Sequence, residues 1–160
     1  MGSSQIEAEN HIFFQNRSGI RVRATDLRNF AGELRGRLKL KGAVAVLICT
    51  DREIRAMNKA FRGKDKATDV LSFPSDIRGH AGDLAISAET ANRNARALKL
   101  SLNDEMKILV LHGMLHLAGF DHETDRGEMA NLEAVIRRRF GLPDGLIERA
   151  HAPAKARTKR

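Results

Sequence analysis

The sequence predicts one α+β domain in which a mixed β-sheet packs against a layer of helices. Four short segments with strand-like composition or alternation end at or before Ser87, and helical periodicity dominates the second half of the chain. The length of 160 residues and the 42% hydrophobic content suit a single domain with a buried core. We expect this domain to span residues 1–148 and a flexible basic tail to follow over residues 149–160.

The four predicted strands cover residues 6–14, 43–49, 70–73 and 83–87. The best defined is Ala43–Cys49, whose sequence AVAVLIC is the continuous apolar run of a central strand buried on both faces. Residues 6–14 and 83–87 show the alternation of strands, and Pro74 ends the short strand before it. Turns or loops are expected at residues 16–19 and 75–81.

Five helices are predicted from the spacing of apolar residues and from capping signals. They cover about residues 25–40, 51–61, 88–98, 102–119 and 125–140. Thr50 with Glu53, and Ser101 with Asp104, have the spacing of capping boxes, so they mark the starts of the second and fourth helices. Gly141 suits the end of the last helix.

The chain is basic, with 28 Lys and Arg against 20 Asp and Glu, a net charge of +8. A field of that sign favours polyanions, nucleic acid first and anionic membrane second. Five of the positive charges lie near the C-terminus, at Arg149, Lys155, Arg157, Lys159 and Arg160. A solvated tail that aids solubility explains them as well as RNA contact does. Because Trp and Tyr are absent, we expect any RNA contacts to rest on phosphates and shape rather than on an aromatic stacking platform.

The sequence also favours a cytoplasmic protein without membrane association. No apolar run approaches the ~20 residues that a bilayer span needs, and the N-terminus lacks the pattern of a secretion signal. Cys49 is the sole cysteine, so an intramolecular disulfide is excluded, and its apolar surroundings predict a small buried residue.

The strongest functional signal is the segment from His112 to His122, HGMLHLAGFDH. His112 and His116 are four residues apart, so they project from one face of a helix. Gly119 suits the left-handed conformation that ends a helix, and the turn returns His122 to the same point. Three converging imidazoles predict one metal ion, because burying them without partners is costly. Three protein ligands plus water are the pattern of a catalytic zinc site, and nickel, cobalt and copper also suit these ligands.

The spacing also matches the metzincin protease signature HExxHxxGxxH, except that Gly113 replaces the Glu that serves as general base. Peptide hydrolysis of that design needs this carboxylate, so it becomes the weaker hypothesis. A zinc ion that activates water and polarises a phosphoryl oxygen needs a nearby cation to stabilise the added charge. Arg62 is the candidate, with Lys64 and Lys66 close in sequence, although charge alone favours a solvated loop for each of them.

Three motifs in this order resemble the YbeY family of bacterial endoribonucleases: FRGKDKATDVLSFP (61–74), GDLAIS (82–87) and HGMLHLAGFDHE (112–123). The resemblance covers about residues 6–142. It implies a four-stranded mixed sheet with five or six helices, zinc bound by His112, His116 and His122, and a role for Arg62 in activity. It also implies cleavage of single-stranded RNA in the maturation of the 3′ end of small-subunit (16S) ribosomal RNA and in ribosome quality control. The partners would be the ribosome or its proteins, with no role for DNA.

Two positions depart from the family pattern, since Ala67 replaces a frequent proline and Phe120 a frequent tyrosine. Asp121 suits either of two roles, orienting a ligand histidine or capping the following turn. Two other functions stay open at this point. One is a metal-stabilised ribosome-assembly factor that binds RNA but has little nuclease activity, and the other is a metallohydrolase of another substrate.

Overall fold

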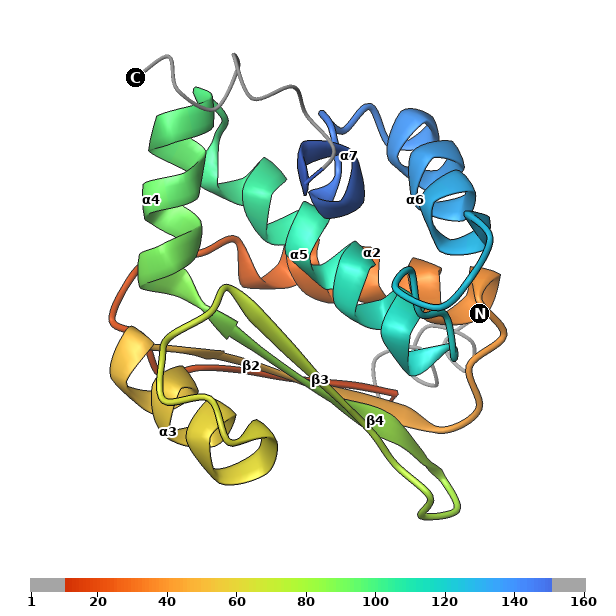
Figure 1. Cartoon of the computed structure of the whole chain (residues 1–160), viewed down its shortest axis with the longest axis horizontal. Coiled ribbons are helices and arrows are strands. Elements are labelled where there is room, and N and C mark those ends of the chain that lie inside the picture. Colours follow the sequence, from red (N-terminus) through yellow and green to blue (C-terminus); the bar gives the residue numbers. More distant parts are fainter. Residues whose placement is uncertain (1–10, 151–160) are drawn as a thin grey trace.

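The computed structural model describes residues 11–150, which form a four-stranded sheet with most of the helices layered on one face (Figure 1). The strands are β1 (Ile12–Asn16), β2 (Ala43–Cys49), β3 (Val70–Pro74) and β4 (His80–Ser87). The helices are α2 (Ala24–Arg37), α3 (Asp51–Arg62), α4 (Ala88–Leu98), α5 (Leu102–Leu117), α6 (Glu128–Arg139) and α7 (Leu146–Ala150). The predicted α+β class is confirmed.

The sheet is mixed, as predicted, with the strand order β1-β2-β4-β3. β1 and β4 both pair in parallel with β2, and β3 pairs antiparallel with β4. β2 is therefore central, which explains its continuous apolar sequence. β3 is an edge strand, so one of its sides has no neighbouring strand.

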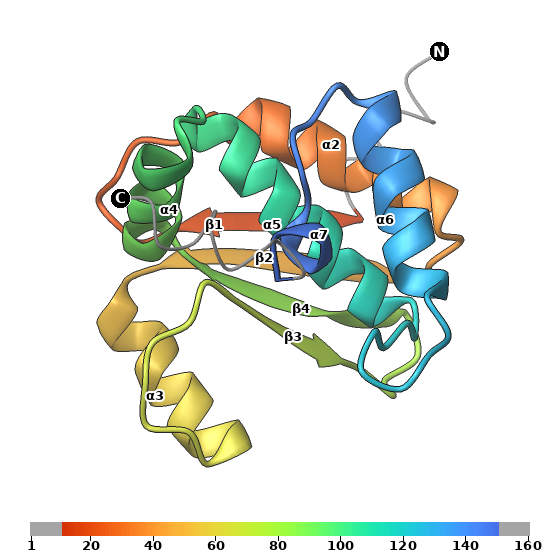
Figure 2. The same cartoon turned by 45° about the horizontal axis from the view of Figure 1, so that its top comes forward.

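α5 is the centre of the helical layer, and it packs across β3 and β4 between α2 and α4. Its residues are apolar almost all round, as expected of a helix that is covered on every side. Figures 1 and 2 show α2, α4, α5, α6 and α7 on the same side of the sheet and α3 alone on the other side. Much of the outer face of the sheet therefore has no helix over it.

Both predicted capping residues start their helices. The Thr50 hydroxyl accepts a hydrogen bond from the Glu53 amide at 3.2 Å, at the start of α3. The Ser101 hydroxyl accepts one from the Asp104 amide at 3.0 Å, at the start of α5. These bonds satisfy amides that have no partner within the helix.

Several boundaries differ from the prediction. β1 continues to Asn16, where a turn was expected, because Asn16 still pairs with Ile48. The first residues of the predicted strand 6–14 lie outside the described residues. β4 begins at His80, inside the predicted loop 75–81, because His80 pairs with Ala43 of the central strand. α6 begins at Glu128 instead of about residue 125, since the Asp125 carboxylate accepts from two amides that precede or open the helix.

α7 was not predicted, and it holds Arg149, the first residue of the expected basic tail. The Arg149 guanidinium donates to the Glu105 carboxylate of α5 at 3.0 Å, and Glu105 is completely buried. The rest of the predicted tail lies outside the described residues. No helix between residues 11 and 150 is long and apolar enough to cross a membrane.

Candidate metal centre

The three predicted histidines come together at the C-terminal end of α5. His112 and His116 lie one turn apart on the helix, and Gly119, with φ +97°, reverses the chain after the helix ends. The following loop returns His122, so that one potential ligand atom from each of the three residues lies within 4.8 Å of the others. The convergence that the spacing predicted is therefore present.

The geometry of this cluster fits one tetrahedral metal ion. The Nε2 atoms of His112 and His116 are 3.2 Å apart. Two ligands of one zinc ion, each bonded at about 2.0–2.1 Å, are about 3.4 Å apart at the tetrahedral angle. The Nδ1 atom of His122 is buried and has no hydrogen-bond partner within residues 11–150, which suits an imidazole beside a metal site.

The lowered pKa of His116 also suits a metal ligand. Burial, followed by the charges of His112 and His122, lowers the pKa of His116. A lowered pKa keeps the imidazole neutral near neutral pH, and the neutral form carries the lone pair that a metal binds.

Glu133 of α6 orients the first ligand. Its Oε2 atom lies 3.0 Å from His112 Nδ1, and its side chain is only 1% exposed. A carboxylate at Nδ1 selects the tautomer that donates from this nitrogen, which leaves the His112 Nε2 lone pair for the metal. Sequence reasoning did not identify Glu133. The available signal was an acid on the buried face of α6, between Met129 and Ile136.

The segment before and within α7 holds Glu133 in turn. The Ile147 amide donates to Glu133 Oε1 at 3.2 Å. A Cβ atom on Gly145 would overlap that same oxygen, so only glycine leaves room for the carboxylate. The Glu133 side chain thus connects α7 to His112, because one of its oxygens accepts from the Ile147 amide and the other contacts His112 Nδ1.

Asp121 caps the turn that carries His122. Its Oδ1 atom accepts a hydrogen bond from the Glu123 amide at 3.0 Å. Among residues 11–150, the carboxylate that contacts one of the three histidines is that of Glu133. Of the two roles that the sequence left open for Asp121, the structure shows the turn cap.

The histidines face a cavity of about 540 Å³ beside the β3 edge. Its lining comes from α3, β3, the segment before β3, the end of α5, the His122 loop and α7: Arg62, Thr68, Asp69, Val70, Ser72, His112, His116, Gly119, Phe120, Asp121, His122, Glu123 and Leu146. The Arg62 guanidinium makes no hydrogen bond or ion pair with any residue that the structure describes, so it is available to a ligand.

Lys64 and Lys66 do not line this cavity. Gly63, with φ +69°, ends α3 in a left-handed conformation and turns the chain away from the histidines. Lys64 is exposed, and Lys66 lines a separate cavity beside Asp51 and Arg55. The structure thus brings Arg62 to the histidines but neither lysine.

The charges of the lining also favour a cation. Asp69, Asp121 and Glu123 outnumber the single guanidinium of Arg62. Three acids beside one guanidinium would repel a polyanion, and a divalent ion at the histidines would offset that charge.

Gly113 packs α5 tightly against the sheet. A Cβ atom at this position would lie 2.7 Å from Leu84 Cδ2 and 3.2 Å from Ser72 Oγ, and the Ser72 hydroxyl donates to the Gly113 carbonyl at 3.1 Å. A larger residue at this position requires the Leu84 or Ser72 side chain to shift. Packing therefore disfavours the carboxylate base of the metzincin design here.

Comparisons with a family model, with individual proteins and with a solved structure relate this chain to known proteins. The family model described as Endoribonuclease YbeY matches residues 12–141. A protein of Koribacter versatilis named Endoribonuclease YbeY is 53% identical over 121 residues, which are 76% of this chain and 80% of that protein. A Solibacter usitatus protein of the same name is 47% identical over 131 residues, or 82% and 88% of the two chains. The solution structure of TM1509 from Thermotoga maritima superposes with a TM-score of 0.59 at 28% identity, covering 81% of this chain and 89% of that one.

Proposed function

Because the chain belongs to the YbeY endoribonuclease family, we propose that it is a single-strand-specific, zinc-dependent endoribonuclease. Its substrate would be the 3′ end of small-subunit (16S) ribosomal RNA, cut during late ribosome maturation and quality control in the cytoplasm. The observation that carries this proposal is the placement of three converging imidazoles and the free Arg62 guanidinium in one cavity. The ribosome or its proteins are the expected partners, and DNA and membranes are not.

The three histidines, Arg62 and Glu133 have distinct tasks in phosphodiester cleavage. His112, His116 and His122 would hold a divalent ion, which would supply a water of lowered pKa, about 7, and a Lewis acid for a phosphoryl oxygen. Arg62, from the α3 side, donates to the non-bridging oxygens and stabilises the negative charge that builds up on them. Glu133 keeps His112 in the ligand tautomer throughout.

Two nucleophiles fit this arrangement, water and the RNA 2′-hydroxyl. They leave different ends, since attack by the 2′-hydroxyl produces a 2′,3′-cyclic phosphate. Analysis of the new 3′ end therefore assigns the nucleophile.

A second function is favoured by one observation, that Gly113 supplies no carboxylate base beside the histidines. Without a carboxylate general base, the metal would chiefly hold α5 and the His122 loop together, with α6 joined through Glu133. The protein would then bind RNA as an assembly factor with little nuclease activity. A metallohydrolase of another substrate has no comparable observation behind it.

A substrate panel tests the proposal. Metal-quantified protein is incubated with a labelled single-stranded RNA of the 16S 3′ end, with the same RNA annealed to its complement, and with DNA of the same sequence. We expect cleavage of the single-stranded RNA alone, abolished by a chelator and restored by zinc. Equal cleavage of all three, or none of the RNA under any metal, would contradict the nuclease proposal, and the second outcome would favour the assembly factor.

A further inference from the structure

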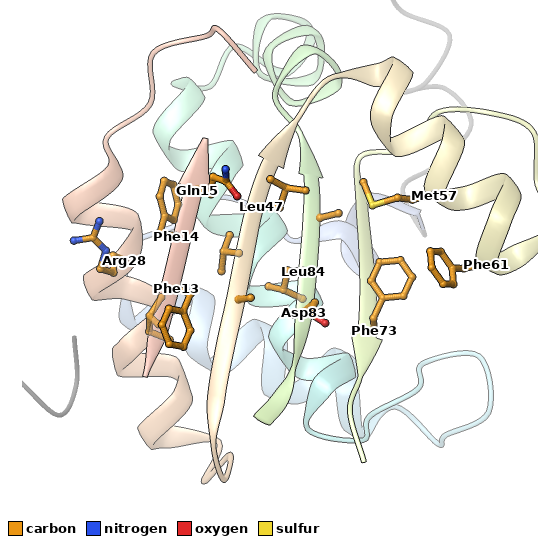
Figure 3. Close-up of a pocket in the computed structure, with 14 residues that line it drawn as sticks. Phe13, Phe14, Gln15, Arg28, Leu47, Met57, Phe61, Phe73, Asp83 and Leu84 are labelled. Carbon is orange, nitrogen blue, oxygen red and sulfur yellow. The ribbon is translucent and has the colours of Figure 1, made fainter. Parts of the chain in front are cut away.

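The outer face of the sheet carries an apolar groove that the metal chemistry does not use. It has a volume of about 630 Å³ and runs across all four strands to α3 (Figure 3). Phe13, Phe61 and Phe73 lie along it, with Leu47 and Met57 between or beside them. We call this surface the Phe61 groove.

The aromatic side chains of the groove are unusually exposed. Phe61 is 71% exposed and Phe13 59%, and they are two of the five large exposed hydrophobic residues between residues 11 and 150. Phe61 contacts Phe73 edge to face, with ring centroids 5.2 Å apart, yet the rest of its ring faces solvent. Figure 3 shows the two rings together at the α3 end of the groove. Clustered apolar exposure of this kind marks a binding surface.

The Phe61 groove and the metal cavity are adjacent along the chain. Phe61 lines the groove and the next residue, Arg62, lines the metal cavity. β3 has the same division, since Ser72 faces the metal cavity and Phe73 faces the groove. Because β3 is the edge strand, a linear ligand that passes over it and the end of α3 contacts both sites.

The charges around the groove select a ligand that is both anionic and apolar. The C-terminal part of α3 and the following turn carry Lys59, Arg62 and Lys64, none of which forms an ion pair with a described residue. Inside the groove the acid is Asp83, which bonds to His80 at 2.9 Å, and Arg28 lies at the far end. A carboxylate there repels phosphates but accepts from the amino groups of bases. Phosphates are therefore favoured along α3 and bases in the groove.

We propose that the Phe61 groove binds bases of the single-stranded RNA whose scissile phosphate lies in the metal cavity. A base stacks on the exposed Phe61 ring, Phe73 supports that ring from the sheet, and the basic end of α3 contacts the adjoining phosphates. This inference rests on the proposed function, because it extends the path of the same substrate. It departs from the sequence-based expectation that RNA contacts rest on phosphates and shape rather than on an aromatic stacking platform.

The test is the affinity of the zinc-loaded protein for a fluorescent single-stranded RNA, measured by anisotropy with the RNA checked for intactness afterwards. Phe61→Ala should weaken binding by about five- to a hundredfold, the usual range for one stacked base. Phe61→Tyr keeps the ring and should restore affinity. Val135→Ala removes another exposed apolar side chain, on α6, and should change nothing. Circular dichroism checks that each variant is folded.

Two further measurements separate stacking from charge. An RNA with abasic sites has no base to stack on Phe61, so its affinity should be low and should be the same for the wild type and Phe61→Ala. The Lys59→Ala variant should lower the slope of log affinity against log salt by about one, whereas Phe61→Ala should leave this slope unchanged.

The inference is overturned if Phe61→Ala binds RNA within twofold of the wild type, which would point to a protein partner for the groove. It is also overturned if Phe61→Ala weakens intact and abasic RNA by the same factor. Because the assay measures binding, a wild type that binds RNA but never cuts it removes the nuclease proposal and still tests the groove. A wild type that binds no RNA overturns both.

Discussion

The Nδ1 atom of His112 on α5 lies 3.0 Å from the buried Oε2 atom of Glu133 on α6. This contact connects a metal ligand to a helix that contributes no ligand of its own. Through the Ile147 amide it also extends to α7, beyond residues 12–141 that the family model matches. The geometry of the three-histidine cluster therefore depends on more of the chain than the histidines themselves.

Replacing Glu133 with Gln should weaken metal binding by about 10- to 100-fold, as loss of an outer carboxylate typically does. The amide keeps the volume of the side chain but no longer favours the His112 tautomer that binds the metal. Competition with a chromophoric chelator measures the dissociation constant. Glu128→Gln, in the first turn of the same helix, is the control. An unchanged constant in the folded Glu133 variant would show that the contact is incidental.

Gly145→Ala should also weaken metal binding, although Gly145 does not contact the histidines in the way that Glu133 does. Its Cβ overlaps Glu133 Oε1, so the carboxylate must shift, and this shift disturbs its contact with His112. The loss in metal affinity should not add to that of Glu133→Gln in the double variant, because both act through one contact. Gly36→Ala, in α2 with open space around it, should bind metal normally. If the losses in metal affinity add fully in the double variant, Gly145→Ala does not act through Glu133.

Gly113→Ala should destabilise the fold by about 1–3 kcal/mol, the usual cost of overpacking. The added Cβ would meet Leu84 between α5 and β4. Urea unfolding of the metal-free proteins measures the difference without a contribution from metal binding. If this variant is as stable as the wild type, packing does not explain why the metzincin glutamate is missing.

Arg149→Ala should destabilise the protein in a pH-dependent way, because it leaves the buried Glu105 carboxylate without its cationic partner and with Asn94 as its side-chain donor. Burial already raises the pKa of Glu105 above its ordinary value of 4.5, and Arg149 opposes this rise. Without Arg149, the folded state holds a proton that the unfolded chain releases above 4.5, so stability falls as the pH rises through this range. We expect a loss of about 3 kcal/mol near neutral pH and a smaller one near the pKa of the unfolded chain.

Thermal or urea unfolding at several pH values measures this loss, with the exposed Arg138→Ala of α6 as the control. A loss that is constant with pH would mean that the Glu105 carboxylate finds another partner.

Features encoded within a short stretch were predictable from the sequence. The His112–His122 cluster follows from helical spacing and one glycine, and the starts of α3 and α5 follow from Thr50 and Ser101. Each depends on residues within about one or two turns, so the local sequence suffices.

Features that depend on tertiary packing were not predictable. Glu133 contacts His112 from 21 positions away in the sequence. The spacing of residues within one helix does not predict a partner on another helix. α7 has five residues, too few for a periodic pattern. Lys64 and Lys66 could not be separated from Arg62 by charge, because the separation depends on the left-handed conformation of Gly63.

The most direct test of the account is cleavage of a labelled single-stranded RNA by metal-quantified wild type, Arg62→Glu and His116→Ala, each shown to be folded. We predict about one zinc per wild-type chain and cleavage by the wild type alone, with Arg62→Glu keeping its metal and His116→Ala losing it. If His116→Ala loses its metal and still cuts RNA as the wild type does, the three histidines are not the catalytic centre.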